Sequence, residues 1–200
     1  FLFFLVVTLF LSIYIAPNNT DALGYHIARV MFWAQNHNLY HFPTQFSPQL
    51  YYNVMSEYFF LQLYLLTGSD YFFNCVQWGA MLVCLLAVSS MLKSWGATKY
   101  LQGLGAILIL TIPQVLLQST SSQNDLLSAS YFIVSLYFGY EIIKVKFTKS
   151  AYFWGVSALI IGGFTKYSVF ILGLPVIIYF AIYQIRVKFS RALFMGIISI

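Results

Sequence analysis

Long apolar runs separated by short polar turns make up most of this chain. The runs cover residues 1–16, 71–92, 100–118, 125–143, 151–165, 168–185 and 192–200. Several of them approach the roughly 20 apolar residues that cross the hydrocarbon core of a bilayer. They are continuously apolar rather than alternating, which favours helices over strands. The pattern therefore predicts an all-α fold, a polytopic helical membrane protein.

Composition supports the same class. Of 200 residues, 60% are hydrophobic and 8% are charged, whereas a soluble chain has roughly a quarter of its residues charged. The first run lacks the basic start and the small-residue cleavage site of a signal peptide. We therefore expect residues 1–200 to be a single transmembrane domain, a fragment that begins inside its first span.

The first polar stretch, residues 17–70, is the longest. Its part up to residue 57 holds all three histidines, Arg29 and two acidic residues. The apolar spacing predicts a helix over residues 21–35. Residues 58–66 are apolar but too few to span, so they predict a helix lying in the membrane interface. Residues 17–70 are thus expected to form an outer loop with interfacial helices.

The basic residues give this arrangement an orientation. Eight of the ten fall in three short turns: Lys93, Lys99, Lys144, Lys146, Lys149, Arg186, Lys188 and Arg191. By the positive-inside rule these turns face the cytoplasm. The outer loop, the polar turn 119–124 and Lys166 then face outward. The net charge of +5 belongs to these turns, so no nucleic-acid partner is predicted.

Two acidic residues, Asp21 and Asp125, stand before predicted helices on the outer side. Aspartate is a favoured N-cap, and that structural role stays open for both. A helix N-terminus also favours the ionised carboxylate, as a general base requires. Lys166 and Arg29 are the basic residues on this side. Lys166 either extends to the lipid headgroups or holds a phosphate in a shared site.

The remaining polar candidates are less specific. His26, His37 and His41 match no zinc spacing, so no metal site is predicted, but His26 could orient a substrate hydroxyl or phosphate. Glu57 is either a helix cap or an acceptor-binding acid. Cys75 and Cys84 are nine residues apart on one predicted helix, about 13 Å along its axis, so they cannot form a disulfide.

The outer loop resembles a known family. Its segments NNTDALGYHIARV (residues 18–30), WAQN (33–36) and HFPT (41–44) are similar to bacterial membrane glycosyltransferases of the GT-C superfamily. The nearest group is family 39-like, related to protein mannosyltransferases and to the lipid A aminoarabinose transferase. Glu57 and the segments GSD (68–70), VQW (76–78), QND (123–125) and TKY (165–167) extend the resemblance over most of the chain.

The resemblance implies an inverting glycosyltransferase that uses a polyprenyl-phosphate-linked sugar as donor. The acceptor hydroxyl would belong to a glycan, a lipid or a protein. The active site would lie on the periplasmic or extracellular face of a bacterial inner membrane. The implied catalytic residues are Asp21 and Asp125, and the implied substrate-binding residues are Tyr25, His26, Arg29, Glu57 and Lys166.

No cofactor is predicted, although a divalent cation stays open. Many relatives carry an Asp-Glu pair where this chain has Asp21 followed by Ala22. The alternatives are a transporter or lipid flippase, to which an interruption of one span at Gly173 and Pro175 would point, and a non-catalytic assembly subunit.

Overall fold

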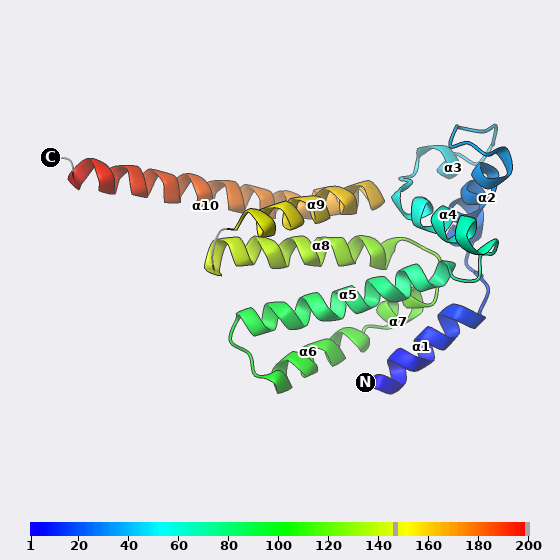
Figure 1. The fold of residues 1–200 in the computed structure, drawn as a ribbon, viewed down its shortest axis with the longest axis horizontal. Helices are drawn as coiled ribbons and strands as arrows, with labels where there is room; N and C mark the ends of the chain where they lie inside the picture. Colours follow the sequence, from blue (N-terminus) through cyan, green and yellow to red (C-terminus); the bar gives the residue numbers. More distant parts are fainter. Residues whose placement is uncertain (146–147, 199–200) are drawn as a thin grey trace.

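The computed structural model describes residues 1–145 and 148–198, with the backbone alone at residues 145, 184 and 187–198. Within these ranges every regular element is a helix and no strand occurs. The predicted all-α class is therefore confirmed for the described part of the chain. The helices form two parts, a long bundle and a compact platform at one of its ends (Figure 1).

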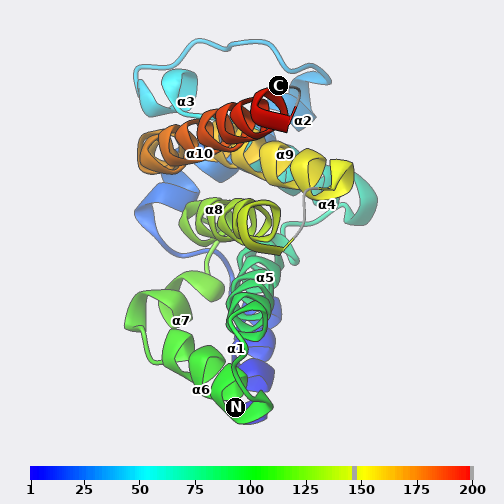
Figure 2. The same cartoon turned by 90° about the vertical axis from the view of Figure 1, so that its left-hand side faces the viewer.

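The bundle is formed mainly by α5 (Phe73–Ser94), α6 (Lys99–Leu110), α8 (Asp125–Tyr140), α9 (Lys149–Thr165) and α10 (Ser168–Ile198). Viewed end on, α8 lies between α5 and α9 (Figure 2). A core of buried apolar residues joins α5, α6 and α8: Ala80, Met81, Leu85, Ala106, Leu110, Leu126 and Leu127.

Among the described residues, two helices are long and apolar enough to cross a membrane. These are α5 and the continuous helix 125–144, in which α8 passes into the π-helical turn η2 (Glu141–Val145). The pair α6 and α7 (Pro113–Ser119), bent by 74°, is a further candidate. α1 (Leu2–Tyr14) and residues 168–183 of α10 are apolar but shorter.

The span predicted over residues 100–118 contains a bend of 74° between α6 and α7. Pro113 is the first residue of α7, and Ile112 before it has extended dihedral angles, φ −75° and ψ 113°. A proline restricts the preceding residue to this extended region, which is incompatible with continuing the helix. Proline does not end the helix everywhere in this chain, because α10 continues through Pro175. The interruption expected at Gly173 and Pro175 is therefore absent.

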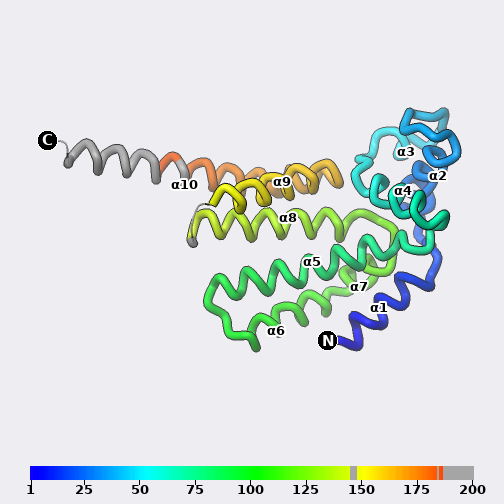
Figure 3. The backbone as a smooth tube through the Cα atoms, in the orientation of Figure 1, coloured from blue at the N-terminus to red at the C-terminus, as the bar shows by residue number. Residues whose placement is uncertain are grey.

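Parts of three predicted features lie outside the described residues. The second basic turn includes residues 146–147, which are not described. For the third basic turn (186–191) and the last predicted span (192–200), side chains beyond residue 186 are not described. Figure 3 marks these residues in grey.

The platform contains η1 (Ala22–His26), α2 (Ile27–Asn36), α3 (Pro48–Tyr51) and α4 (Met55–Thr67). The helices predicted at 21–35 and 58–66 are thus present, although η1 is a π-helical turn and α4 begins earlier. Along this first helix the apolar Ile27 and Val30 are buried, whereas Leu23 is exposed and the charged Arg29 is buried. An extra residue in the π-helical turn shifts the register there.

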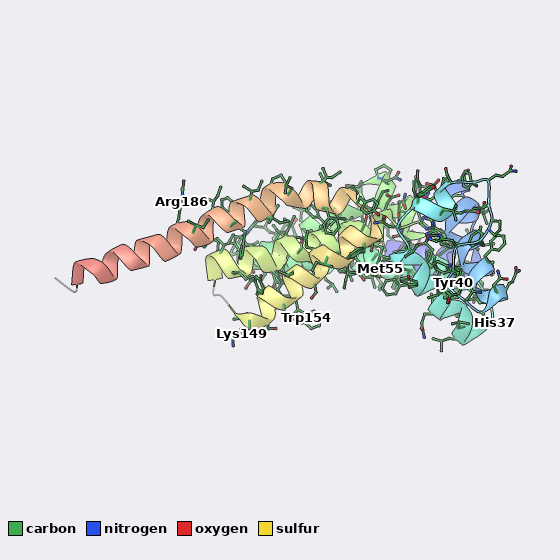
Figure 4. All side chains as sticks on the ribbon, turned by 90° about the horizontal axis from the view of Figure 1, so that it is seen from above. His37, Tyr40, Met55, Lys149, Trp154 and Arg186 are labelled. Atoms are coloured by element: carbon green, nitrogen blue, oxygen red, sulfur yellow. The ribbon has the colours of Figure 1, made fainter. Side chains whose placement is uncertain are left out.

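The predicted outer segments lie at one end of the bundle and the described basic residues Lys149 and Arg186 lie toward the other, as the sequence predicts (Figure 1, Figure 4). The α7–α8 and α9–α10 junctions lie at the platform end (Figure 1). Lys149 and Arg186 lie toward the opposite end, away from His37 and Tyr40 on the platform (Figure 4). The outer loop, the turn 119–124 and Lys166 are therefore at one end of the molecule.

Candidate functional site

A cavity of about 420 Å³ lies where the platform meets the bundle. Its walls come from four stretches of sequence: the start of the platform helix, the residues after α3, and the two junctions at the end of the bundle. The lining residues are Asp21, Tyr25, Tyr52, Asn53, Asn124, Thr165, Lys166, Tyr167 and Ser168. A larger cavity of about 570 Å³ between α4, α5, α8 and α9 is lined mostly by apolar side chains. Of these two cavities, the smaller one contains the charged side chains, Asp21 and Lys166.

Asp21 lies exposed at this cavity, directly before η1. Its side chain does not cap the helix. Asn19 does so instead, because its Oδ1 accepts a hydrogen bond from the Ala22 N–H at 2.7 Å. Among the described residues no hydrogen bond or ion pair engages the Asp21 carboxylate. The structure therefore leaves this carboxylate free to act on a ligand.

Lys166 enters the cavity from the opposite wall. It occupies the extended break between α9 and α10, with φ −154° and ψ 125°. Its Nζ forms an ion pair with Asp125 Oδ1, and both side chains are about two-fifths exposed. Because the pair is half in solvent, it contributes little to stability, but it fixes where the ammonium lies.

Asp125 is itself held in place. It is the first residue of α8, and the N-cap position before it is held by Asn124. Its Oδ2 accepts a hydrogen bond from Gln118 Nε2 at 3.1 Å. Gln118 in turn contacts the buried Gln77 at 3.5 Å, and Gln77 Oε1 accepts the N–H of Leu127 at 2.7 Å. Asp125 is thus a positioned counter-ion of Lys166.

Two glycines allow the sharp return that presents Lys166. A Cβ at Gly162 would lie 2.9 Å from the Tyr131 Cβ, and a Cβ at Gly163 would collide with the Phe170 ring. Asn124 Nδ2 donates to the Thr165 carbonyl at 3.1 Å and so joins the two junctions. The absence of side chains at these two positions therefore allows α9 to pack closely against Tyr131 of α8 and Phe170 of α10.

Tyr25 lies between the acidic groups of the cavity and the buried interior. Burial raises the pKa of its phenol, and the charges of Asp21, Asp125 and Glu57 raise it further. Its ring meets that of Tyr52 edge-on, with centroids 5.1 Å apart. The phenol therefore stays protonated over the ordinary pH range and is available as a hydrogen-bond donor.

The structure places Arg29, Glu57 and His26 behind this wall and not in the cavity. All three are buried, with 1%, 0% and 0% of their surface exposed, and none lines the cavity with Asp21. The Arg29 Nη1 donates to Glu57 Oε1 at 2.6 Å. Burial lowers the pKa of Arg29 and the Glu57 charge opposes that change. The structure therefore does not bring these three residues together with Asp21 in one cavity, and their predicted role in substrate binding stays a prediction.

His26 and the other histidines do not form a metal centre. His26 Nδ1 lies 3.2 Å from Glu57 Oε1, and neither ring nitrogen has a hydrogen-bond partner among the described residues. His37 and His41 are exposed on the platform. In the part of the chain that the structure describes, no three His, Cys, Asp or Glu residues group closely enough to hold a metal ion. Cys75 and Cys84 on α5 are free thiols.

Tyr52 and Asn53 are the cavity residues that sequence reasoning missed. They follow the four-residue helix α3, and no spacing or charge pattern in the sequence marks them. Asn124 and Tyr167 stand next to Asp125 and Lys166, so the segments QND and TKY already pointed to their neighbourhood. No family model, curated protein or solved structure matches this chain.

Proposed function

We propose that this protein is a membrane glycosyltransferase that moves a sugar from a polyprenyl-phosphate donor to an acceptor hydroxyl. The observation that carries the proposal is the pairing, in one cavity, of the free Asp21 carboxylate with the Lys166 ammonium on the opposite wall. A general base and a cation that binds phosphate are the two groups that such a transfer needs. The resemblance of the outer loop to the GT-C superfamily supports the same reaction.

The reaction follows from these positions. The Asp21 carboxylate takes the proton of the acceptor hydroxyl as its oxygen attacks the anomeric carbon. The bond between that carbon and the phosphate oxygen breaks, and its electron pair leaves with the polyprenyl phosphate. Attack from the side opposite the leaving group inverts the anomeric configuration. The proton on Asp21 then passes to solvent, to which its exposed side chain is open.

Lys166 and Asp125 act on the leaving group. Negative charge grows on the phosphate as the bond breaks, and a positioned ammonium stabilises it. Asp125 holds that ammonium in place. It is therefore assigned a supporting role, instead of the direct catalytic contact that the sequence suggested. The Tyr25 phenol is a neutral hydrogen-bond donor to the sugar or phosphate.

The size and place of the cavity suit such a donor. Small-molecule sites occupy roughly 300–1,000 Å³, and a cavity of about 420 Å³ accommodates a sugar phosphate. It lies at the end of the helices that are long enough to cross a membrane. There a lipid phosphate would sit at headgroup level while its polyprenyl chain stays in the bilayer. In this proposal the site faces the periplasm or cell exterior, across a bacterial inner membrane.

The first test uses polyprenyl phosphate, the product common to every sugar donor of this class. Its binding to the full-length protein in nanodiscs is compared between wild type, Lys166→Gln and Lys93→Gln. Lys93 is an exposed lysine at the end of α5 distant from the platform, so it controls for the loss of one charge. Lys166→Gln is expected to weaken binding about tenfold, as the loss of one charge-assisted contact does. Equal affinity in all three proteins would remove the phosphate role of Lys166.

A further inference from the structure

The buried Arg29 guanidinium ties together the segment that follows α2 in the platform. It donates hydrogen bonds to three backbone carbonyls within six residues: Pro48 at 2.8 Å, Gln49 at 2.9 Å and Asn53 at 3.3 Å. Its fourth contact is Glu57 Oε1, and Ser56 Oγ donates to the other oxygen of that carboxylate at 2.6 Å. The guanidinium thus clamps the backbone of residues 48–53 from within the platform.

Residues 48–53 connect the part of the platform that carries Asp21 with the part of the bundle that carries Lys166. On one side Gln49 Nε2 donates to the Gly24 carbonyl at 2.6 Å, in the π-helical turn that follows Asp21. On the other side Asn53 Nδ2 donates to the Gly163 carbonyl at 2.8 Å, three residues before Lys166. Tyr52 and Asn53 in this segment line the cavity. Residues 48–53 are therefore the link through which the Asp21 wall is held against the Lys166 wall.

We propose that Arg29 is a positioning residue, which fixes residues 48–53 and thereby sets the separation between Asp21 and a substrate held at Lys166. The proposal rests on the function proposed above. It differs from the expectation that Arg29 binds the phosphate itself, because the guanidinium is 1% exposed and does not line the cavity that holds Asp21 and Lys166.

The chemistry of the side chain explains why an arginine is needed. A planar guanidinium has five N–H donors in a fixed fork, while a lysine ammonium has three donors and is a compact point charge. Arg29→Lys keeps a positive charge beside Glu57 but cannot make all four contacts at once. It therefore loosens the segment while keeping the buried charge balanced.

The kinetic consequence separates positioning from substrate binding. A misplacement of about 1 Å in an active site can cost about a hundredfold in rate. Arg29→Lys is therefore expected to lower kcat by about that factor, with donor KM changing little because Lys166 and Asp125 remain. Asn53→Ala removes only the tie to Gly163 and is expected to shift kcat in the same direction. The double variant should be no worse than Arg29→Lys alone, because both changes break one link.

Turnover of a lipid-linked sugar by the full-length protein is measured for these variants and for the control Arg186→Lys. Arg186 is exposed and points away from the bundle at the end opposite the platform (Figure 4), so its variant should behave as wild type. A rise in KM with unchanged kcat in Arg29→Lys would overturn the proposal in favour of direct substrate contact. Wild-type kinetics, or losses that multiply in the double variant, would also overturn it.

A second measurement does not depend on glycosyl transfer. Spin labels are placed at Tyr51→Cys and Phe164→Cys, both exposed positions, with Cys75 and Cys84 replaced. The distance between them reports how residues 48–53 sit against α9. Arg29→Lys and Asn53→Ala are expected to broaden the distance distribution, and Arg186→Lys to leave it unchanged. An unchanged distribution in the first two would overturn the clamp, whereas a protein inactive with every donor but showing the broadening would retain it and contradict only the proposed function.

Discussion

At the scale of single residues, the charged side chains divide by environment into two sets. Asp21 and Lys166 line one cavity and the partly exposed Asp125 pairs with Lys166, whereas Arg29 and Glu57 are buried against each other. The sequence identified the first set by position, since each stands at the end of a predicted helix on the outer side. It named Arg29 and Glu57 as well but could not predict that they pair, because pairing between residues 28 positions apart depends on how the loop folds back.

Tyr25→Phe tests the protonation state inferred for this phenol. Burial and the nearby carboxylates raise the pKa of Tyr25 above its ordinary value of about 10. For a phenol a raised pKa favours the neutral form, so Tyr25 does not ionise as the pH rises through the working range. The variant is expected to lose part of its turnover by losing a hydrogen-bond donor, while the alkaline limb of its pH–rate profile stays where it is in wild type. An alkaline limb that disappears in Tyr25→Phe would show that the phenol titrates.

At the scale of elements, the α9–α10 hairpin and the π-helical turn η1 set the geometry of the site. The hairpin was predicted from the short segment Thr165–Tyr167, and the structure shows how Gly162 and Gly163 permit it. The π-helical turn and the bend at Pro113 were not predicted. Hydrophobic periodicity shows which residues are apolar, but it cannot reveal that one turn of a helix contains an extra residue, as a π-helical turn does. A span interrupted by proline has the same apolar pattern as a straight one.

Gly163→Ala tests the hairpin. The added methyl group collides with the Phe170 ring, so the ring or the start of α10 beside Lys166 must shift. We expect weaker polyprenyl-phosphate binding and partial recovery in the double variant Gly163→Ala/Phe170→Leu, which makes room. Gly103→Ala in α6 is the control, because nothing lies near its added methyl group and the exchange stabilises a helix by roughly 0.5–1 kcal/mol. Wild-type binding in Gly163→Ala would show that the hairpin does not position Lys166.

At the scale of the whole molecule, the main feature is that the two ends of the bundle carry different groups. The platform and the cavity occupy one end, while Lys149 and Arg186 lie toward the other (Figure 4). The sequence predicted this separation because the positive-inside rule needs only the order of spans and the position of basic turns. Which end faces the cytoplasm is a separate prediction, and it decides which substrates can reach Asp21.

Thiol labelling tests that orientation. In a background without Cys75 and Cys84, Asn38→Cys on the platform and Ser150→Cys at the start of α9 are both exposed positions. A membrane-impermeant maleimide is expected to label Asn38→Cys in intact cells and Ser150→Cys only after the membrane is opened. The reverse pattern would place the cavity in the cytoplasm.

The central claim is that Asp21 is the base of a sugar transfer from a lipid phosphate. The most direct measurement is release of polyprenyl phosphate from a panel of lipid-linked sugars by the full-length protein, wild type beside Asp21→Asn and Asp70→Asn. Asp70 is an exposed acid of the same loop outside the cavity, so its variant controls for the charge. Release is expected to fall by about 10²–10⁴-fold in Asp21→Asn alone, as for loss of a general base, while polyprenyl phosphate still binds. Release at the wild-type rate in Asp21→Asn would contradict the claim.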